Sequence, residues 1–521
     1  MDWWHPLLST LQLVAVAVSI SLAIGIPSAW ATDILSRSGF IGRWLAHAFI
    51  LAMIMAIAIP LILHAAAWEA TAGKFGWLTM TQTGSRSFEA FRGLVASGWI
   101  HAVVGSAIVT VATWYGTRSQ SRGMIEATSL DVGPLRAWWT IQLPVAWPWV
   151  FAACVANAGL AATEMTVVDL YGYRTIADEF YLFYAVNPNL ISVIVTCGVP
   201  LAIAFTFIGI VIFSSNSLSR RCRLTQTRQE MDLGEHAEKP GLLITLIAAA
   251  IVTASLLVVV AVPVVGLIAK AGHQIVITDN HVSTDWSLAR AMSQVMTAPR
   301  VFAREYQWTM VLGFVTGLLA TLLAWPLASI GRKNESAERI MDIASVVMFC
   351  IPGPIVGLTV VGLFQYNIPL FRFLYEMTIV PTVMALSVRA IAVAYWVLRS
   401  GYRSIDNSVL ASAKLDSLWW QCFWRIERPL LSGTLVTSIL AVAIVASGDV
   451  PVTLPVAPPG VSTVGTRLFG LLHSGARYQE AALALWYLAM VLLLALAIGV
   501  GVHRQRARIV REKDEQVFCD H

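Results

Sequence analysis

The sequence predicts an all-α polytopic membrane protein. Of its 521 residues, 57% are hydrophobic and only 12% are charged, whereas an average soluble domain carries about 25% charged residues. The mean hydropathy is +0.71. Apolar stretches of about 20 residues, the length of a helix that crosses a bilayer, recur along the whole chain. This composition excludes a soluble globule, a disordered chain and a disulfide scaffold.

Each apolar stretch is expected to be a helix, because backbone polar groups in lipid must pair within their own segment. We expect eleven spans. They are 7–30, 43–68, 95–116, 145–164, 190–213, 242–269, 307–330, 341–364, 378–399, 430–449 and 481–503. The first stretch lacks the basic region of a signal peptide and is long, so we interpret it as a span.

Lys and Arg set the expected orientation, since cytoplasmic loops carry an excess of both. With the N-terminus outside, the inner segments hold 23 of the 35 Lys and Arg residues and the outer segments hold 11. The basic tail at 504–521 would then be cytoplasmic. The sequence therefore predicts a multi-pass protein of the cell inner (plasma) membrane with an external N-terminus and a cytoplasmic C-terminus.

Two inner segments, Glu126–Pro144 and Ala411–Pro429, match when the sequence is aligned on itself at an offset of 285 residues. We call this the repeat offset. The matched positions are Leu130–Asp131 with Leu415–Asp416, Trp139 with Trp424, Ile141 with Ile426, Pro144 with Pro429 and, further along, Glu164 with Asp449. Spans 1–5 then correspond to spans 7–11 in the same orientation, which is a parallel repeat. This predicts a first half at 1–213, a cytoplasmic linker at 214–241 and a second half at 242–521.

The repeated inner segments, 117–144 and 400–429, are long for simple connectors. Asp131 and Asp416 can begin short helices. The proline that ends each segment can sit in the first turn of the next span and act as the hinge between loop and span. We interpret each segment as a helix–turn–helix elbow that transmits force from a cytoplasmic partner. The alternative is an interfacial amphipathic helix without a partner.

The runs EATSLDVG and IQLP of the first elbow resemble the EAA loop of binding-protein-dependent ABC importer permeases. In that family the loop docks in a groove of the ATPase subunit. The residues that the resemblance assigns to ATPase docking are Glu126, Ala127, Leu130, Asp131 and Gly133 in the first copy and Ala413, Leu415 and Asp416 in the second. In the first copy Val132 stands between Asp131 and Gly133, where the family has Gly directly after the Asp. The second copy has Ala411 in place of Glu, Leu418 in place of Gly133, and Arg428 before the proline. The second elbow is therefore expected either to couple less tightly or to contact its ATPase differently.

Three proline-containing stretches resemble the ferric-iron and thiamine branch of these permeases: Pro60 in AIPLILHAAAW, Pro352 in CIPGPIVGLTV, and Pro458–Thr463. Fused two-half permeases with two MetI-like helical bundles are typical of that branch. Its first half often begins with an extra span, which would bring the number to twelve. The resemblance implies a dimer of cytoplasmic ABC ATPase subunits and an extracytoplasmic solute-binding protein as partners, with iron(III) as the solute.

The sequence holds no phosphate-binding G-x-x-x-x-G-K-[ST] loop, no H-E-x-x-H motif and no G-x-S-x-G elbow. We therefore expect a transport subunit without catalytic residues, cofactor or metal site, which contacts lipid and binds no nucleic acid. Thiamine, a polyamine or an oxyanion would fit the same residues as iron(III). An ion-driven secondary transporter and a membrane scaffold are the alternatives from other classes.

Ionisable residues within a membrane are costly and are functional candidates by default. Glu164 and Asp449 are expected near the outer ends of their spans, where they either attract a cationic solute or simply end a span in water. Arg389 lies within a span and either faces the pathway or binds backbone carbonyls between helices. His64 and His101 are expected to be packed or interfacial residues. Glu164, Asp449 and Arg389 are thus the candidate pathway residues.

Overall fold

The structure is a computed structural model, and it describes residues 4–73, 91–118, 133–186, 240–278, 281–366, 368–405, 419–474 and 477–519. Within these ranges the chain is all-α apart from one two-stranded hairpin. Eight described helices are long and apolar enough to cross a membrane, and there are up to ten spans if two bent helix pairs count as one span each. The protein is therefore a multi-pass membrane protein.

The predicted spans agree with these helices wherever the structure describes the chain. Only the predicted span 190–213 lies outside the described residues. The predicted span 341–364 corresponds to a helix pair bent by 90°, and the predicted span 430–449 to the second helix of a pair bent by 75° at Leu431. The sequence predicts 341–364 as one straight span, because hydropathy records the length of an apolar stretch and not its direction.

Two compact units make up the chain: Met1–Met296 with Leu472–Leu485, and Thr297–Leu471 with Trp486–His521. We call them unit 1 and unit 2. The predicted sixth span, which the sequence prediction placed in the second half, lies in unit 1. These units do not show a duplication, so the predicted division into two duplicated halves stays a prediction.

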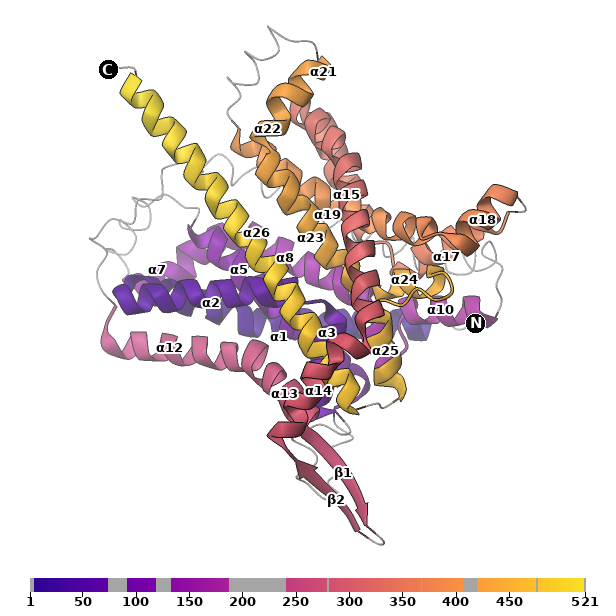
Figure 1. The fold of residues 1–521 in the computed structure, drawn as a ribbon. Helices are drawn as coiled ribbons and strands as arrows, with labels where there is room; N and C mark the ends of the chain where they lie inside the picture. The colour runs from indigo at the N-terminus through magenta and orange to yellow at the C-terminus, as the bar shows by residue number, and fades with distance from the viewer. Residues whose placement is uncertain are drawn as a thin grey trace. The chain divides into compact units, whose positions relative to one another are not determined.

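Unit 1 is built on a long first helix. Its elements are α1 (Trp4–Arg37), α2 (Phe40–Ala58), α3 (Leu61–Ala72), α5 (Gly93–Arg118), α7 (Pro134–Ala137), η2 (Trp138–Gln142), α8 (Leu143–Thr163), α9 (Thr166–Leu170), α10 (Ile176–Val186), α12 (Leu242–Leu256), η3 (Leu257–Ala261), α13 (Val262–Gly272), β1 (His273–Thr278), β2 (His281–Trp286) and most of α14 (Leu288–Val301). Helix α1 packs against α2, α5, α8 and α12, and Figure 1 shows α2, α5 and α12 running side by side. Buried Trp30, Phe49, Ile100 and Trp138 belong to the core between these helices.

The hairpin and α14 lie between the predicted spans 242–269 and 307–330, where the sequence predicts no element. Strands β1 and β2 are antiparallel, with His273 opposite Trp286 and Thr278 opposite His281. They extend from the end of α13 (Figure 1). The Trp286 indole donates a hydrogen bond to the Ala269 carbonyl over 3.0 Å, which ties the hairpin to α13.

Unit 2 is built on α15. Its elements are α15 (Ala303–Lys333), α16 (Glu335–Phe349), α17 (Gly353–Phe364), α18 (Pro369–Met377), α19 (Val380–Ser404), α21 (Trp419–Cys422), η4 (Phe423–Glu427), α22 (Arg428–Leu430), α23 (Ser432–Gly448), α24 (Val450–Val456), α25 (Val464–Ser474) and most of α26 (Arg477–Cys519). Helix α15 packs along α16, α19 and α23, and α17 packs against α24. Trp325, Tyr395, Tyr402 and Phe423 are buried in the core that α15 and α19 share.

Prolines explain the irregular turns within the spans. The described π-helical segments η2, η3 and η4 each end two residues before a proline: Pro144, Pro263 and Pro429. Proline has no N–H, and its ring clashes with the carbonyl four residues earlier. A π turn widens the helix there, and the residue before each proline donates five residues back, as Leu143 does to Trp138.

Two helix breaks also lie at prolines. Pro60 separates α2 from α3, and Pro352 separates α16 from α17. The missing N–H of Pro60 leaves the Ala56 carbonyl without its helical donor, and the His64 imidazole donates to that carbonyl over 3.0 Å. His64 is therefore a packed residue with a backbone partner, as the sequence predicted.

A buried ion pair joins two elements of unit 1. The Lys270 ammonium, near the end of α13, lies 2.5 Å from the Glu480 carboxylate, in the first turns of α26. Their side chains are only 6% and 2% exposed. Two charges taken out of water are tolerable only while they neutralise each other.

We expect Lys270→Met to lower the free energy of unfolding by about 3 to 5 kcal/mol, because it leaves the Glu480 carboxylate buried and unpaired. Adding Glu480→Leu removes both charges and should restore most of the loss. Arg372→Met is the control, because the Arg372–Glu376 pair is exposed and should be worth less than about 1 kcal/mol. Denaturant unfolding in detergent measures all three, and an equal loss in single and double variants would contradict the prediction.

The start of α10 carries a second buried acid. The Asp178 side chain is 3% exposed and lies 3.4 Å from the half-exposed Arg174 guanidinium. Burial, with a contribution from the charge of Asp169, raises the pKa of Asp178 to about 7, although Arg174 opposes the shift. The folded state therefore binds a proton that the unfolded chain releases at lower pH.

The raised pKa of Asp178 predicts a loss of stability as the pH rises from about 4 to about 7. The loss has an upper limit of about 4 kcal/mol, at about 1.4 kcal/mol for each pKa unit. Asp178→Asn is neutral at every pH, so its stability should fall less than that of the parent over this range. Melting curves at pH 5 and pH 8 measure the difference, and parallel losses in both proteins would contradict it.

Candidate functional site

Most of the predicted docking residues of the two elbows lie outside the described residues. These are Glu126, Ala127, Leu130 and Asp131 in the first copy and Ala413, Leu415 and Asp416 in the second. Their role stays a prediction. The structure describes the parts of the elbows that follow, from Gly133 in unit 1 and from Trp419 in unit 2.

The described parts of the elbows have helix bounds that match at the repeat offset. The first consists of α7, η2 and α8, and the second of α21, η4, α22 and α23. At this offset, Trp138 and Thr163 correspond to Phe423 and Gly448, where the matching elements begin or end. Pro144 and Pro429 both stand in the first turn of the helix after the π segment.

The two copies differ just after the proline. The helix pair Trp420–Leu430 and Ser432–Gly448 bends by 75°, and Leu431 lies between its two parts. The residues Trp138–Thr163 form a single span without such a bend. The second elbow therefore joins its span at a corner, and the first does not.

Gly133 begins the described part of the first elbow. Its φ is +78°, and a Cβ added there would meet nothing within 4 Å. Its carbonyl accepts a hydrogen bond of 2.9 Å from the Ala137 N–H, which starts α7. Glycine is needed here by the left-handed backbone and not by close packing.

A buried polar cluster lies where the second elbow meets the bundle of unit 2. The Glu427 carboxylate, in η4, accepts hydrogen bonds from the Tyr402 hydroxyl over 2.5 Å and the Ser329 hydroxyl over 3.2 Å. The Trp325 indole donates to the Tyr402 oxygen over 3.0 Å. We call Trp325, Ser329, Tyr402 and Glu427 the base cluster; it joins α15, α19 and η4.

Arg332 supports the same region from the end of α15. Its guanidinium donates to the Tyr402 carbonyl over 2.5 Å and to the Ile405 carbonyl over 2.7 Å. The last carbonyls of a helix lack partners within it, so a cation here satisfies them and matches the negative end of the helix dipole. The end of α19 is thus fastened to α15.

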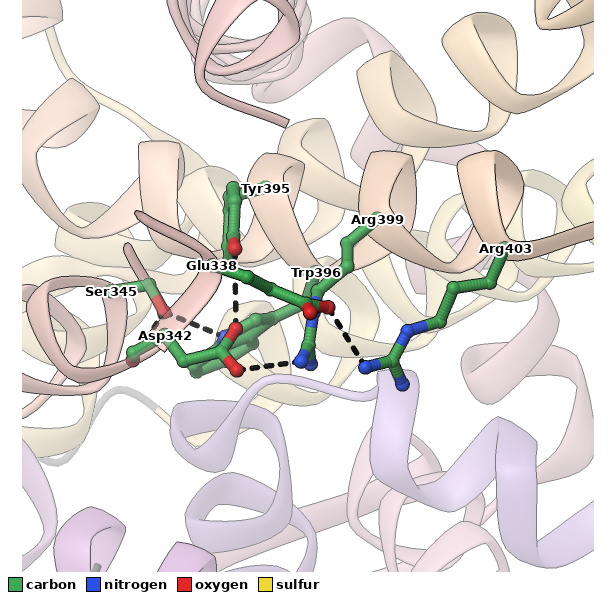
Figure 2. Close-up of polar contacts among 7 residues, drawn as sticks. All are labelled: Glu338, Asp342, Ser345, Tyr395, Trp396, Arg399 and Arg403. Atoms are coloured by element: carbon green, nitrogen blue, oxygen red, sulfur yellow. Dashed lines mark hydrogen bonds and ion pairs between the residues drawn. The ribbon is translucent and has the colours of Figure 1, made fainter. Parts of the chain in front are cut away.

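An ion-pair network joins α16 to α19 close to this end of the helix (Figure 2). Arg399 lies 2.9 Å from Glu338 and 2.6 Å from Asp342. Arg403 lies 2.9 Å from Glu338, and Tyr395 donates to Asp342 over 3.2 Å. The charged groups are partly exposed, so the network holds two helices together without the cost of full burial.

The first elbow meets its bundle through close packing. Trp138 is 1% exposed and Gln142 is 2% exposed. A Cβ added to Gly116 would lie 3.0 Å from Ala146 and 2.7 Å from Trp149, so α5 approaches α8 closely there. At the repeat offset Gln142 corresponds to Glu427, and it is a neutral side chain in the place of that carboxylate.

Glu164 ends α8 and caps the next short helix. Its carboxylate accepts hydrogen bonds from the Thr166 N–H over 2.9 Å and the Val167 N–H over 2.8 Å, and also from the Thr166 hydroxyl. An anion at a helix N-terminus satisfies N–H groups that have no helical partner. Glu164 therefore has a structural task within unit 1.

Asp449 and Arg389 form a buried pair in unit 2. The Arg389 guanidinium donates to both carboxylate oxygens of Asp449, over 3.0 and 3.2 Å, and to the Phe349 carbonyl over 3.3 Å. Asp449 is 8% and Arg389 9% exposed. Arg389 thus binds a carbonyl between helices, one of the two predicted alternatives, and it also neutralises Asp449.

Sequence reasoning did not find the base cluster or the Lys270–Glu480 pair. Glu427 was the available signal, because it is a carboxylate just before the proline that starts a span. Its partners Tyr402 and Ser329 are 25 and 98 residues away along the chain. Such pairings depend on how helices pack, which hydropathy does not record.

The buried acids Glu427, Asp449 and Glu480 are engaged by cations or hydroxyls, and the half-buried Glu164 accepts backbone N–H groups. These contacts hold helices together. Among the residues that the structure describes, no group of three or more His, Cys, Asp or Glu side chains is placed to hold a metal ion. No protein-family model matches the chain, and no curated protein matches its sequence.

Proposed function

We propose that this chain is the membrane-spanning permease subunit of an ATP-binding-cassette importer. The observation that carries the proposal is the match between the two elbows. In both, a short helix, a π segment, a proline and a span follow one another with bounds that agree at the repeat offset. A proline alone produces the π segment, as η3 before Pro263 shows, so the match rests on the equal spacing from π segment to span end, Trp138 to Thr163 and Phe423 to Gly448.

The internal contacts of the two units support a duplication. In unit 1 the Ile176 N–H, at the start of α10, donates to the Thr10 hydroxyl over 3.1 Å. In unit 2 the Val464 N–H, at the start of α25, donates to the Thr309 hydroxyl over 2.8 Å. In each case a short helix after an acid-ended span is tied to the first helix of its unit. We propose that the two units arose from one ancestral half.

In this proposal the elbows lie at the cytoplasmic face and the C-terminus is cytoplasmic. A dimer of separate ATPase subunits binds the elbows and closes on ATP. An extracytoplasmic binding protein delivers the solute, and the spans alternate between outward and inward access. We propose iron(III) as the solute on the resemblance alone, with thiamine, a polyamine or an oxyanion as alternatives. The chain itself performs no covalent chemistry.

The ion-driven secondary transporter remains the rival function. It requires paired intramembrane acids that are free to bind protons or cations. Asp449 is held by Arg389, and Glu164 accepts backbone N–H groups. These contacts favour a structural role for both acids, and they therefore favour the ATP-driven importer.

Gly133→Ala tests the docking role of the first elbow. A side chain at φ +78° costs about 1 to 2 kcal/mol, so binding of the ATPase should weaken about five- to thirty-fold. Gly172→Ala is the matched control, because Gly172 has φ +65° and also meets nothing within 4 Å. Titration of purified permease with the P-loop ATPase encoded nearest to its gene gives both affinities.

The parent protein decides between the importer and its rival. The importer requires that the ATPase co-purifies with the parent and that transport into vesicles stops without ATP. If no ATPase binds and a proton gradient alone drives transport, the chain is a secondary transporter. If Gly133→Ala and Gly172→Ala bind the ATPase with equal affinity, the first elbow is not part of the docking surface.

A further inference from the structure

The base cluster joins the two ends of the second elbow. Tyr402 lies near the end of α19, before the segment 406–418, and Glu427 lies after that segment. The bond of 2.5 Å between them joins the chain that enters the elbow to the chain that leaves it. Trp325, Ser329, Tyr402 and Glu427 are each 4% exposed or less.

Both ends of the elbow are also fastened to one helix, α15. Ser329 donates to Glu427, and Trp325 donates to Tyr402. The Trp325 ring stacks on Phe423, in η4, with ring centroids 4.1 Å apart. Arg332 adds its two bonds to the carbonyls at the end of α19. Both ends of the elbow are therefore held against α15, and we call this set of contacts the mount.

Hydrogen bonds to a buried carboxylate are among the stronger interactions in a protein, at about 1.5 to 3 kcal/mol each. Removing one donor also leaves part of the buried charge unsatisfied, which adds to the cost. A carboxylate at position 427 with two hydroxyl donors thus gives the mount a stiffness that apolar packing alone does not provide.

The first elbow carries different side chains at these positions. At the repeat offset, Thr117 stands in the place of Tyr402, and Gln142 stands in the place of Glu427. The Thr117 hydroxyl donates to the Trp114 carbonyl of its own helix over 3.1 Å. The close approach of α5 to α8 at Gly116 provides a contact between the helices. The buried carboxylate therefore belongs to the second elbow.

We infer that Glu427 is a positioning residue that makes the second elbow and α15 move as one body. A displacement of the elbow by its ATPase subunit then reaches the spans through Tyr402 and Ser329. Without these bonds the elbow would still dock, but its motion would be partly lost in bending at the mount. This inference rests on the proposed function.

The experiment measures the coupling ratio, which is the number of solute molecules imported per ATP hydrolysed. It uses vesicles that contain the full permease with its ATPase, and iron(III) presented by the binding protein. Tyr402→Phe removes one donor to Glu427 and should lower the ratio about fivefold or more, with ATPase affinity and ATP turnover kept. Glu427→Gln keeps an acceptor oxygen for both hydroxyls but lacks the charge, so its ratio should lie between those of Tyr402→Phe and the parent.

Tyr395→Phe is the matched control. It removes a tyrosine hydroxyl from the same helix, where the bond of 3.2 Å goes to Asp342 instead, and its coupling ratio should stay at the parent level. Ser329→Ala removes the other donor without a cavity, and it replaces Tyr402→Phe if that variant does not assemble. A lower ratio in Ser329→Ala supports the inference, and an unchanged ratio overturns it.

Two outcomes separate the inference from the proposed function. If the parent imports solute with ATP and Tyr402→Phe or Ser329→Ala keeps the parent ratio, the inference fails and the importer stands. An equal fall in Tyr395→Phe also overturns it, because the loss would then be a general effect of helix α19. If the parent binds no ATPase, the proposed function itself fails.

Discussion

The pairing of backbone polar groups in a water-poor environment governs this structure. A span of about 20 apolar residues is stable only as a helix, because lipid offers its N–H and C=O groups no partner. Each proline removes one N–H and so creates a local defect. The chain repairs these defects in two ways: by a π turn before Pro144, Pro263 and Pro429, and by a side chain that reaches the freed carbonyl, as His64 does at Ala56.

The same constraint explains where the buried charges lie. Arg389 is costly within a span, yet it satisfies the Phe349 carbonyl at the break before Pro352 and neutralises Asp449. Glu164 is placed where short-helix N–H groups need an acceptor. Lys270 and Glu480 neutralise each other. In each case the charge is retained because a neighbouring polar group would otherwise be left without a partner.

Hydropathy was sufficient to predict the class of the protein and the apolar helices that the structure describes, because both depend on the length of apolar stretches. The prolines at 60 and 352 were visible in the sequence, but the 90° bend at the second was not predicted, since its direction depends on packing against α24. The hairpin at 273–286 was also missed, because it lies in a segment with no apolar run of span length. The candidate site was predictable only in its local part, around Gly133 and the prolines that follow each elbow. The base cluster depends on contacts between residues up to 98 positions apart, and no local pattern indicates it.

Under the proposed function, the hydrogen-bonded contact between the second elbow and α15 and the weak resemblance of this elbow to the EAA pattern have a common explanation. If docking residues of the second copy contribute less binding energy, less of the ATPase motion is available to move the spans. A stiff contact between elbow and α15 bends less, so more of that motion reaches the spans. The first elbow has Glu126 and Gly133 of the family pattern and packs closely at Gly116. Divergence of a duplicated half would then have exchanged docking strength for stiffness at Glu427.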